Sequence, residues 1–319
     1  MKIFFTGKNA AQGLKDSDPT SLTSAAEKLE FTISETLTSQ VDLFVCVDFE
    51  TATLKLVRRA QRLGVRTCLI INEPSVVIPQ HAQSRILKKF DKVIYVGRPH
   101  PEPMLKWPQT WTPIRITGSR IDRAVIVNAD KWSFVRGQHY WLRAAISKQD
   151  LSVDIYGPGW SRTVLERALH RVYEFVRTLF SGTRPSFKGL KYVLANPKNY
   201  LGMAKDKVET MSRYKVAVVI ENSSELMTEK LFDAWFAGCV PVFVGPLVKH
   251  LGIPEDLVIE TAPDVKSVQT AIQVALRMDF HVFHVRLEEF LRSKAALEWK
   301  AELAIAKVLT EATKTNSAS

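Results

Sequence analysis

Short apolar runs alternate with helix-like segments through the first third of the chain. Four runs have the length and the β-branched or aromatic content of buried strands: residues 2–6, 41–47, 66–71 and 92–96. Between the second and third runs, Leu56, Ala60 and Leu63 recur at a helical spacing, and Gly64 ends the segment. Because strands that alternate with helices form parallel sheets covered on both faces, this pattern predicts a doubly wound α/β domain.

The same alternation returns in the second half of the chain. Apolar runs predict strands at residues 124–127, 152–156, 216–220, 240–244 and 257–259. A helix is expected near residues 132–146. From about residue 265 to 309 the pattern is helical, and one apolar face is formed by Phe290, Leu297, Ala301, Ala304 and Val308.

The 319 residues and their ordinary globular composition are typical of two domains. A stretch rich in proline and tryptophan, without strand or helix periodicity, separates the two patterns. We predict an N-terminal Rossmann-like domain at residues 1–105, a linker at 106–120 and a C-terminal Rossmann-like domain at 121–282. The second domain has a basic insert at 161–200, and a helix at 283–312 and a disordered tail at 313–319 follow it.

Residues 213–246 form the most informative stretch. An apolar strand at 216–220 stops abruptly at Glu221, Asn222 and Ser223. Thr228 is then expected to cap a short helix, which Gly238 ends in the left-handed conformation. In open α/β sheets ligands bind beyond the carboxyl ends of the strands, so this strand-helix-strand unit predicts a ligand site at its polar loop.

Four elements of this stretch occur in a fixed order: ENS at 221–223, TEK at 228–230, Leu-x-x-Ala at 231–234 and AGCVPVFVGP at 237–246. Together they resemble the donor-binding signature of glycosyltransferase family 10, the α-1,3/1,4-fucosyltransferases. The resemblance implies an α/β protein of GT-B fold, with two Rossmann-like domains facing each other across a cleft. It further implies an inverting transfer of L-fucose from GDP-fucose to a hydroxyl group, without a metal ion or other cofactor.

The chain also departs from the family pattern. Residues 224–227 make a loop about two residues shorter than the family usually has, and Leu226 stands where an aromatic residue is expected. The identity of the donor sugar, and to a lesser degree that of the nucleobase of the donor, is therefore open at this point.

Glu73 is the candidate for the base that accepts the proton of the acceptor hydroxyl. It follows the apolar run at 66–71 and precedes Pro74, which restricts the loop. The resemblance extends to this Glu-Pro segment and to LKKFDKVIYVG at 87–97, and it implies that Glu73 is the base. The alternative is an exposed loop glutamate without a catalytic role.

The leaving diphosphate requires positive charge, and Lys230 and Arg136 are the candidates. Lys230 is expected in the first turn of a helix, where a cation is favourable only if an anion binds nearby. The resemblance implies that Arg136, in SFVRGQHYWL, also contacts the diphosphate and that Asn128 is the residue at the end of the preceding strand. A surface arginine on a helix is the alternative for Arg136.

The remaining donor-binding candidates lie in the signature itself. The resemblance assigns Glu229 to the ribose hydroxyls, and Glu221 with Glu229 forms the E-x7-E spacing of many GT-B enzymes. Asn222 and Ser223 are expected to donate hydrogen bonds to phosphate or sugar oxygens. Glu229 at a helix start and the Asn222–Ser223 pair as loop caps also have purely structural explanations.

The formal net charge of +11 is concentrated in one region. Residues 161–215 contain twelve Lys and Arg against four acidic residues, a net +8. A basic insert suits peripheral contact with a membrane surface that carries anionic, lipid-linked acceptors; an ordinary solvated face is the alternative. Nucleic acid is not expected as a partner, because no recognised binding motif with stacking aromatics accompanies the charge.

Three cysteines, Cys46, Cys68 and Cys239, lie in apolar strand-like contexts without a CxxC pair, which indicates reduced core residues and a cytoplasmic protein. The Asp16-Ser17-Asp18 triplet has a metal-binding DxD form but no strand leads into it, so we interpret it as a turn.

We therefore predict a fucosyltransferase that uses GDP-fucose and modifies a surface or lipid-linked glycan of the lipopolysaccharide type. The alternatives are a GT-B transferase with another nucleotide sugar, a non-catalytic protein that binds nucleotides or carbohydrates, and a basic nucleic-acid-binding protein.

Overall fold

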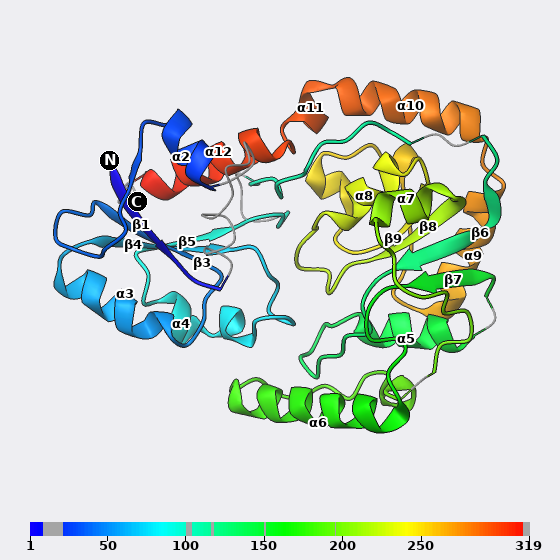
Figure 1. Ribbon diagram of the computed structural model, residues 1–319, viewed down its shortest axis with the longest axis horizontal. Helices are drawn as coiled ribbons and strands as arrows, with labels where there is room; N and C mark the ends of the chain where they lie inside the picture. The colour runs from blue at the N-terminus through cyan, green and yellow to red at the C-terminus, as the bar shows by residue number, and fades with distance from the viewer. Residues whose placement is uncertain (9–21, 100–103, 116–117, 150, 195, 315–319) are drawn as a thin grey trace. The chain divides into compact units, whose positions relative to one another are not determined.

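The computed structural model describes residues 1–8, 22–99, 104–115, 118–149, 151–194 and 196–314. The chain divides into two units, each treated by itself: unit 1 is Met1–Trp111 with Leu297–Ser319, and unit 2 is Thr112–Ala296. In Figure 1 each unit has its own β-sheet with helices against it. The Asp16-Ser17-Asp18 triplet and most of the predicted tail at 313–319 lie outside the described residues.

Unit 1 is built on a five-stranded parallel sheet in the order β2-β1-β3-β4-β5. Its strands are β1 (Lys2–Thr6), β2 (Thr32–Ile33), β3 (Leu43–Val47), β4 (Arg66–Ile71) and β5 (Lys92–Tyr95). Its helices are α2 (Leu22–Lys28), α3 (Thr53–Arg62), the 3-10 helix η1 (Pro79–Ala82), α4 (Ser84–Leu87) and α12 (Ala301–Thr313).

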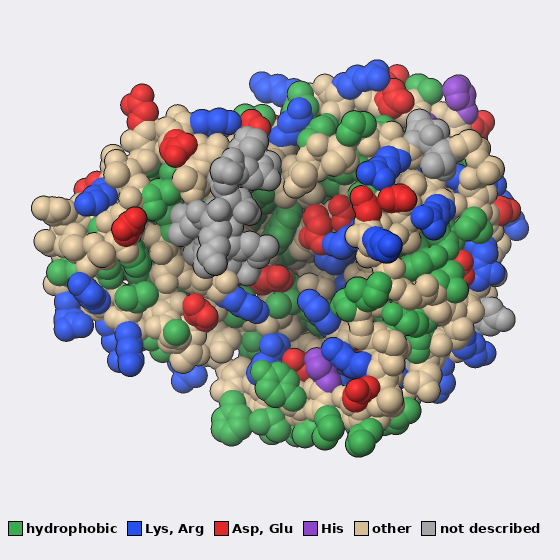
Figure 2. Space-filling view, viewed as in Figure 1, with side chains coloured by type: hydrophobic (Ala, Val, Ile, Leu, Met, Phe, Trp, Pro, Cys, Tyr) green, Lys and Arg blue, Asp and Glu red, His purple; other side chains and the backbone are tan. Residues whose placement is uncertain are grey.

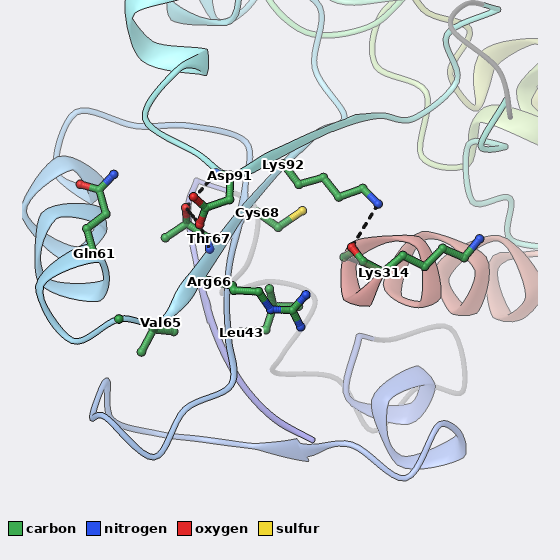
Figure 3. Close-up of a pocket in the computed structure, with 11 residues that line it drawn as sticks. Leu43, Gln61, Val65, Arg66, Thr67, Cys68, Asp91, Lys92 and Lys314 are labelled. Carbon is green, nitrogen blue, oxygen red and sulfur yellow. Dashed lines mark hydrogen bonds between the residues drawn. The ribbon is translucent and has the colours of Figure 1, made fainter. Parts of the chain in front are cut away.

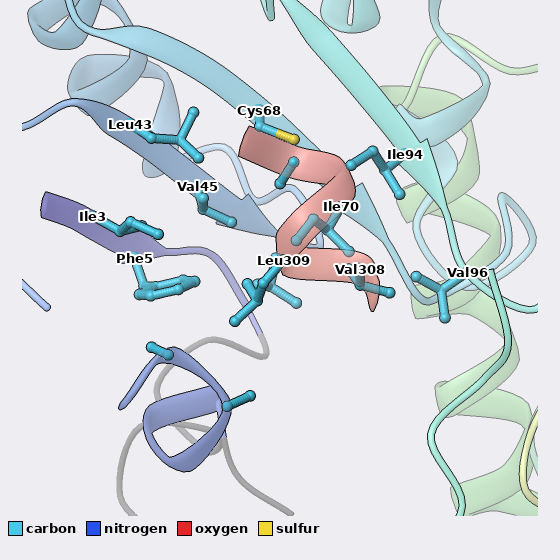
Figure 4. Close-up of a cluster of buried hydrophobic side chains, with 14 of the residues drawn as sticks. Ile3, Phe5, Leu43, Val45, Cys68, Ile70, Ile94, Val96, Val308 and Leu309 are labelled. Atoms are coloured by element: carbon cyan, nitrogen blue, oxygen red, sulfur yellow. The ribbon is translucent and has the colours of Figure 1, made fainter. Parts of the chain in front are cut away.

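Alternating residues of the unit 1 strands point to opposite faces of the sheet, and each face has its own core. Leu43, Val45 and Val47 belong to one cluster, while Phe44 and Cys46 of the same strand belong to the other. Figure 4 shows the first cluster, in which Val308 and Leu309 of α12 pack against strand residues. The C-terminal helix therefore covers one face of the N-terminal sheet.

Unit 2 repeats the same topology. Its parallel sheet has the order β10-β9-β8-β6-β7, formed by β6 (Ile121–Val127), β7 (Val153–Tyr156), β8 (Tyr214–Ile220), β9 (Val240–Val244) and β10 (Ile259–Glu260). In both units the first strand of the sheet lies next to an edge strand, which is the second strand in the sequence. The third strand then lies on the opposite side of the first strand.

The helices of unit 2 are α5 (Tyr140–Lys148), α6 (Val164–Phe180), α7 (Lys207–Ser212), α8 (Lys230–Phe236), α9 (Val265–Leu276), α10 (Phe280–Arg292) and α11 (Lys294–Leu297), whose last residue is assigned to unit 1. Three 3-10 helices accompany them: η2 (Leu190–Tyr192), η3 (Val248–Leu251) and η4 (Glu255–Leu257). Thr163 and Glu166 form a capping box at the start of α6.

Two helix predictions need correction. The helix expected near 132–146 begins only at Tyr140, and the preceding segment is irregular. The single helix expected at 283–312 is three helices, because the chain is extended at Ser293 and leaves helical geometry at Lys300. Phe290 packs on Trp235 of unit 2 with ring centroids 5.5 Å apart, whereas Val308 lies in the core of unit 1. The shared apolar face predicted for these residues is therefore wrong.

Candidate functional site

The topology of unit 2 points to one edge of its sheet. The strand order reverses between β6 and β8, and in open parallel sheets this switch point, at the carboxyl ends of the strands, is where ligands bind. Asn128 follows β6 and Glu221 follows β8. Since the two strands are direct neighbours, the loops that start at these residues begin side by side at this edge.

Glu221, Thr228 and Lys230 form a closed cluster at this edge. The Glu221 carboxylate is fully buried; it accepts a hydrogen bond from the Thr228 backbone N–H at 2.8 Å and forms an ion pair with Lys230 Nζ at 2.8 Å. The Thr228 hydroxyl lies within 3.0 Å of both carboxylate oxygens. A buried carboxylate is tolerable only with such partners, so the cluster closes the loop between β8 and α8.

The cluster corrects one expectation about α8. Thr228 does not cap this helix, because its hydroxyl is engaged by Glu221; Glu229 occupies the cap position with helical backbone angles and makes no capping hydrogen bond. Gly238 does adopt the predicted left-handed conformation after the helix, with φ of +67°. Lys230 is the first residue of α8, as expected.

Lys230 remains charged although it is largely buried. Burial alone would lower the pKa of its ammonium, but Glu221 and Glu229 outweigh this effect and raise the pKa. Lys230 Nζ donates to Glu221 Oε2 and, at 2.6 Å, to Thr228 Oγ1. An ammonium has three donors, so one N–H of Lys230 is not assigned by these two contacts.

Glu229 is the more accessible carboxylate of the E-x7-E pair. Its side chain is 37% exposed, and Lys207 Nζ lies 3.5 Å from Oε1. Burial would raise the pKa of Glu229, but Lys230 and Lys207 lower it to about 2. Glu229 is therefore an ionised hydrogen-bond acceptor at neutral pH, whereas Glu221 is an internal structural group.

The short loop at residues 224–227 is anchored by its apolar side chains. Leu226 and Met227 are 2% and 0% exposed, so Leu226 is a core residue in the place where an aromatic was expected. Ser223 is buried, and its hydroxyl accepts a hydrogen bond from the Glu225 backbone N–H at 3.2 Å. Asn222 is only half-buried, which leaves it as the better ligand candidate of the two.

Asn128 and Arg136 lie in different surroundings. Asn128 O accepts a hydrogen bond from Trp160 Nε1 at 2.7 Å, and only glycine fits at position 157, where a Cβ would lie 2.3 Å from the same oxygen. Arg136 is exposed on the turn before α5, not on a helix as predicted. Among the described residues Arg136 makes no hydrogen bond or ion pair, so the structure does not join it to the Glu221 cluster.

Glu73 lies in unit 1, after β4, in a tightly held main-chain segment. Asp48 Oδ1 accepts hydrogen bonds from the backbone N–H groups of Asn72 and Glu73, at 2.8 and 2.9 Å. His81 Nε2 accepts from Phe49 N–H, which leaves its Nδ1–H to donate to Glu73 O at 2.8 Å. The main chain of Glu73 is thus fixed from two sides while its side chain is half-buried.

No family model matches the sequence. A segment of 43 residues, 13% of the chain, is 51% identical to a fucosyltransferase-like protein of Arabidopsis thaliana and spans 8% of that protein's length.

Solved structures resemble the chain over nearly its whole length. HepE of Anabaena, in complex with UDP and glucose, has a TM-score of 0.55 at 12% identity over 98% of both chains. An α1,3-fucosyltransferase with GDP has a TM-score of 0.52 at 13% identity over 99% of this chain and 91% of that chain. The chain has the GT-B fold. The predicted fold class is confirmed, and the 43-residue match supports the resemblance to fucosyltransferases.

A pocket of unit 1 lies at the amino-terminal ends of the strands, whereas Glu73 follows the carboxyl end of β4. It has a volume of about 480 Å³ and is lined by residues at the starts of β4 and β5, among them Arg66 and Lys92. Figure 3 shows Lys92 directed at Lys314, whose carbonyl it contacts at 3.5 Å; Lys92 also pairs with Glu311 at 2.7 Å. Because it lies at the amino-terminal ends of the strands, we do not assign the pocket to the reaction.

The described residues contain no group of three or more His, Cys, Asp or Glu side chains that could hold a metal ion.

Three residues that hold candidate residues in place within their own units were not predicted. Asp48 and His81 hold the main chain of Glu73, and Arg143 of α5 holds the loop after β8. Arg143 donates to Ile220 O and, at 3.0 Å, to Asn222 Oδ1, and it is buried. The only signal in the sequence is a charged residue within the apolar run at 140–146, which requires a buried partner.

We expect Arg143→Met to lower the free energy of unfolding by about 3 kcal/mol, because it leaves the buried Ile220 carbonyl and the half-buried Asn222 side-chain oxygen without this donor. Chemical denaturation measures the change, and Lys148→Met, an exposed site on the same helix, is the matched control. Equal stability of the two variants would contradict a structural role of Arg143 at this loop.

Proposed function

We propose that the protein is an inverting, metal-independent glycosyltransferase that moves L-fucose from GDP-fucose to a hydroxyl of a surface or lipid-linked glycan of the lipopolysaccharide type. The main support is the Glu221–Thr228–Lys230 cluster beside the accessible Glu229, at the switch point of unit 2. These residues lie in the motif that resembles the family 10 donor signature. The α1,3-fucosyltransferase of the same fold was solved with GDP-fucose.

In the proposed binding mode unit 2 holds the donor. Glu229 accepts hydrogen bonds from the ribose hydroxyls, and Asn222 and Ser223 contact phosphate or sugar oxygens. Lys230 uses its remaining N–H for the diphosphate. Because Glu221 already compensates the charge of Lys230, Arg136 has to supply the additional positive charge, and Asn128 marks the neighbouring strand end.

The proposed reaction is a single displacement. Glu73 takes the proton of the acceptor hydroxyl while the oxygen of that hydroxyl attacks the anomeric carbon of the donor. The bond from that carbon to the phosphate oxygen breaks, its electron pair leaves with GDP, and the configuration inverts. Lys230 and Arg136 stabilise the charge that develops on the departing diphosphate.

A UDP-sugar is the second candidate donor. Two observations favour it: HepE of the same fold was solved with UDP and glucose, and the loop at 224–227 buries Leu226 where the family pattern has an aromatic residue. The roles of Glu73, Glu229 and Lys230 would be the same, so only the contacts to the nucleobase and to the donor sugar distinguish the two candidates.

A thermal-shift panel with GDP, UDP, CMP, ADP and GDP-fucose tests the donor. A nucleotide at one hundred times its Kd should stabilise the native state by about 2.7 kcal/mol, because it binds the folded protein alone. We expect the largest shift with GDP and GDP-fucose. A selective shift with UDP would replace the donor assignment, and no shift with any nucleotide would contradict the transferase.

A further inference from the structure

Helix α6 (Val164–Phe180) presents an apolar face to solvent. Leu165, Leu169, Val172, Tyr173, Val176 and Phe180 are between 40% and 87% exposed. Their spacing places all six on one side of the helix. Figure 2 shows hydrophobic side chains gathered along the edge of unit 2 that α6 forms in Figure 1. Contiguous exposed apolar surface of this kind marks an interaction site.

The opposite face of α6 is charged and buried. Arg167 donates to Asp130 Oδ2 at 3.0 Å, and Arg171 pairs with the other carboxylate oxygen. Glu174 and Thr178 are buried on the same side. Turning the apolar face inward would leave the Asp130 carboxylate without its two arginines, which is strongly unfavourable for a buried charge. The outward direction of the apolar face is therefore fixed by the contacts beneath the helix.

The segment that carries the apolar face is basic. Once the buried Arg167 and Arg171 and the Glu174–Arg177 ion pair are set aside, residues 161–200 carry one acidic residue, Glu166, against five basic ones: Arg162, Arg184, Lys188, Lys191 and Lys198. A second copy packed on the same face would bring these like charges together. An anionic lipid surface matches both the apolar face and the charge around it.

We propose that α6 lies in the interface of an anionic membrane, with its apolar face inserted among the lipid chains and the surrounding basic residues at the headgroups. Tyr173 and Phe180 supply the aromatic side chains that favour this depth. Among the described helices none has the length and apolarity to cross a bilayer.

The inference deepens the proposed function. Its biological sense rests on the proposed lipid-linked acceptor, but its test does not depend on that acceptor. Asp130 joins α6 to the segment after β6, two residues beyond Asn128. The membrane-binding helix is thereby attached to the donor-binding edge of unit 2. A sugar acceptor held in the membrane is the substrate class that such a helix serves.

Vesicle flotation tests the proposal with the full chain. We expect it to float with vesicles of phosphatidylcholine and phosphatidylglycerol, and much less with phosphatidylcholine alone. Leu169→Glu with Phe180→Glu should weaken flotation at least tenfold, and Leu169→Ala with Phe180→Ala should weaken it less. Val274→Glu with Val282→Glu, at exposed apolar positions of α9 and α10, is the matched control and should float normally.

The charge contribution is tested separately. Arg184→Glu with Lys198→Glu should reduce binding to anionic vesicles about tenfold or more, while Lys249→Glu with Lys266→Glu should not. Nucleotide thermal shifts without vesicles should be equal in all variants, which separates this proposal from the donor assignment. Absence of flotation by the unmodified chain would overturn the proposal. A second contradicting result would be a concentration-dependent dimer of the unmodified chain in sedimentation, together with no vesicle binding. If the α6 variants abolished this dimer, the apolar face would join two copies of the chain.

Discussion

Replacing Glu73 with glutamine should lower the rate of sugar transfer by two to four orders of magnitude, the usual contribution of a general base. Glutamine keeps the size of the side chain and cannot accept the proton of the acceptor hydroxyl. The main chain at this position is held by Asp48 and His81 through backbone atoms, so the substitution should leave the local structure intact. Single-turnover rates with GDP-fucose and a glycan acceptor measure the effect.

The matched control for this prediction is Glu50→Gln. Glu50 is an exposed glutamate that follows β3 of the same sheet, and its replacement should leave the rate unchanged. GDP should stabilise the Glu73→Gln variant as much as the original chain, because the nucleotide is assigned to unit 2. A rate within tenfold of the original would show that Glu73 is not the base.

Most strands and their ends could be predicted because parallel strands buried on both faces are continuous apolar runs. The two short edge strands were the exceptions, because β2 was not predicted and β10 was placed about two residues too early. β8 ends at Ile220, so Glu221 is the first polar residue beyond the sheet, as the pattern indicates. Gly238 could be placed for a similar reason, since its local conformation favours glycine. Predictions that depend on one segment and its immediate neighbours were therefore the reliable ones.

Contacts between distant segments could not be predicted. Asp48 binds the main chain of Glu73, 25 residues away, and Arg143 reaches Asn222 across 79 residues. Nothing in the local pattern around Asp48 or Arg143 indicates these partners. The same limit explains Thr228, whose local setting is that of a helix cap but whose hydroxyl is used by Glu221.

Helical periodicity also leaves open what a helix packs against. Val308 recurs in register with Phe290, yet the two residues belong to cores of different units. In the region predicted as a basic insert, Arg167 and Arg171 are not surface charges, because Asp130 pairs with both. Part of the net charge counted from the sequence is therefore internal.

Lys230→Met should both destabilise the protein and remove its response to GDP. The substitution leaves the fully buried Glu221 carboxylate without its cation, a change that costs about 3–5 kcal/mol in comparable buried pairs. It also removes the ammonium that we assign to the diphosphate. Chemical denaturation measures the first effect, and the thermal shift with GDP measures the second.

A second substitution separates these two roles of Lys230. In Lys230→Met with Glu221→Gln the buried group is neutral, so most of the lost stability should return while the response to GDP should not. Lys215→Met removes a lysine ion pair at the other end of β8 and should cost about 1 kcal/mol or less, with a normal nucleotide response. A normal GDP shift in the double variant would mean that Lys230 only closes the loop over Glu221, and the diphosphate would then depend on Arg136 alone.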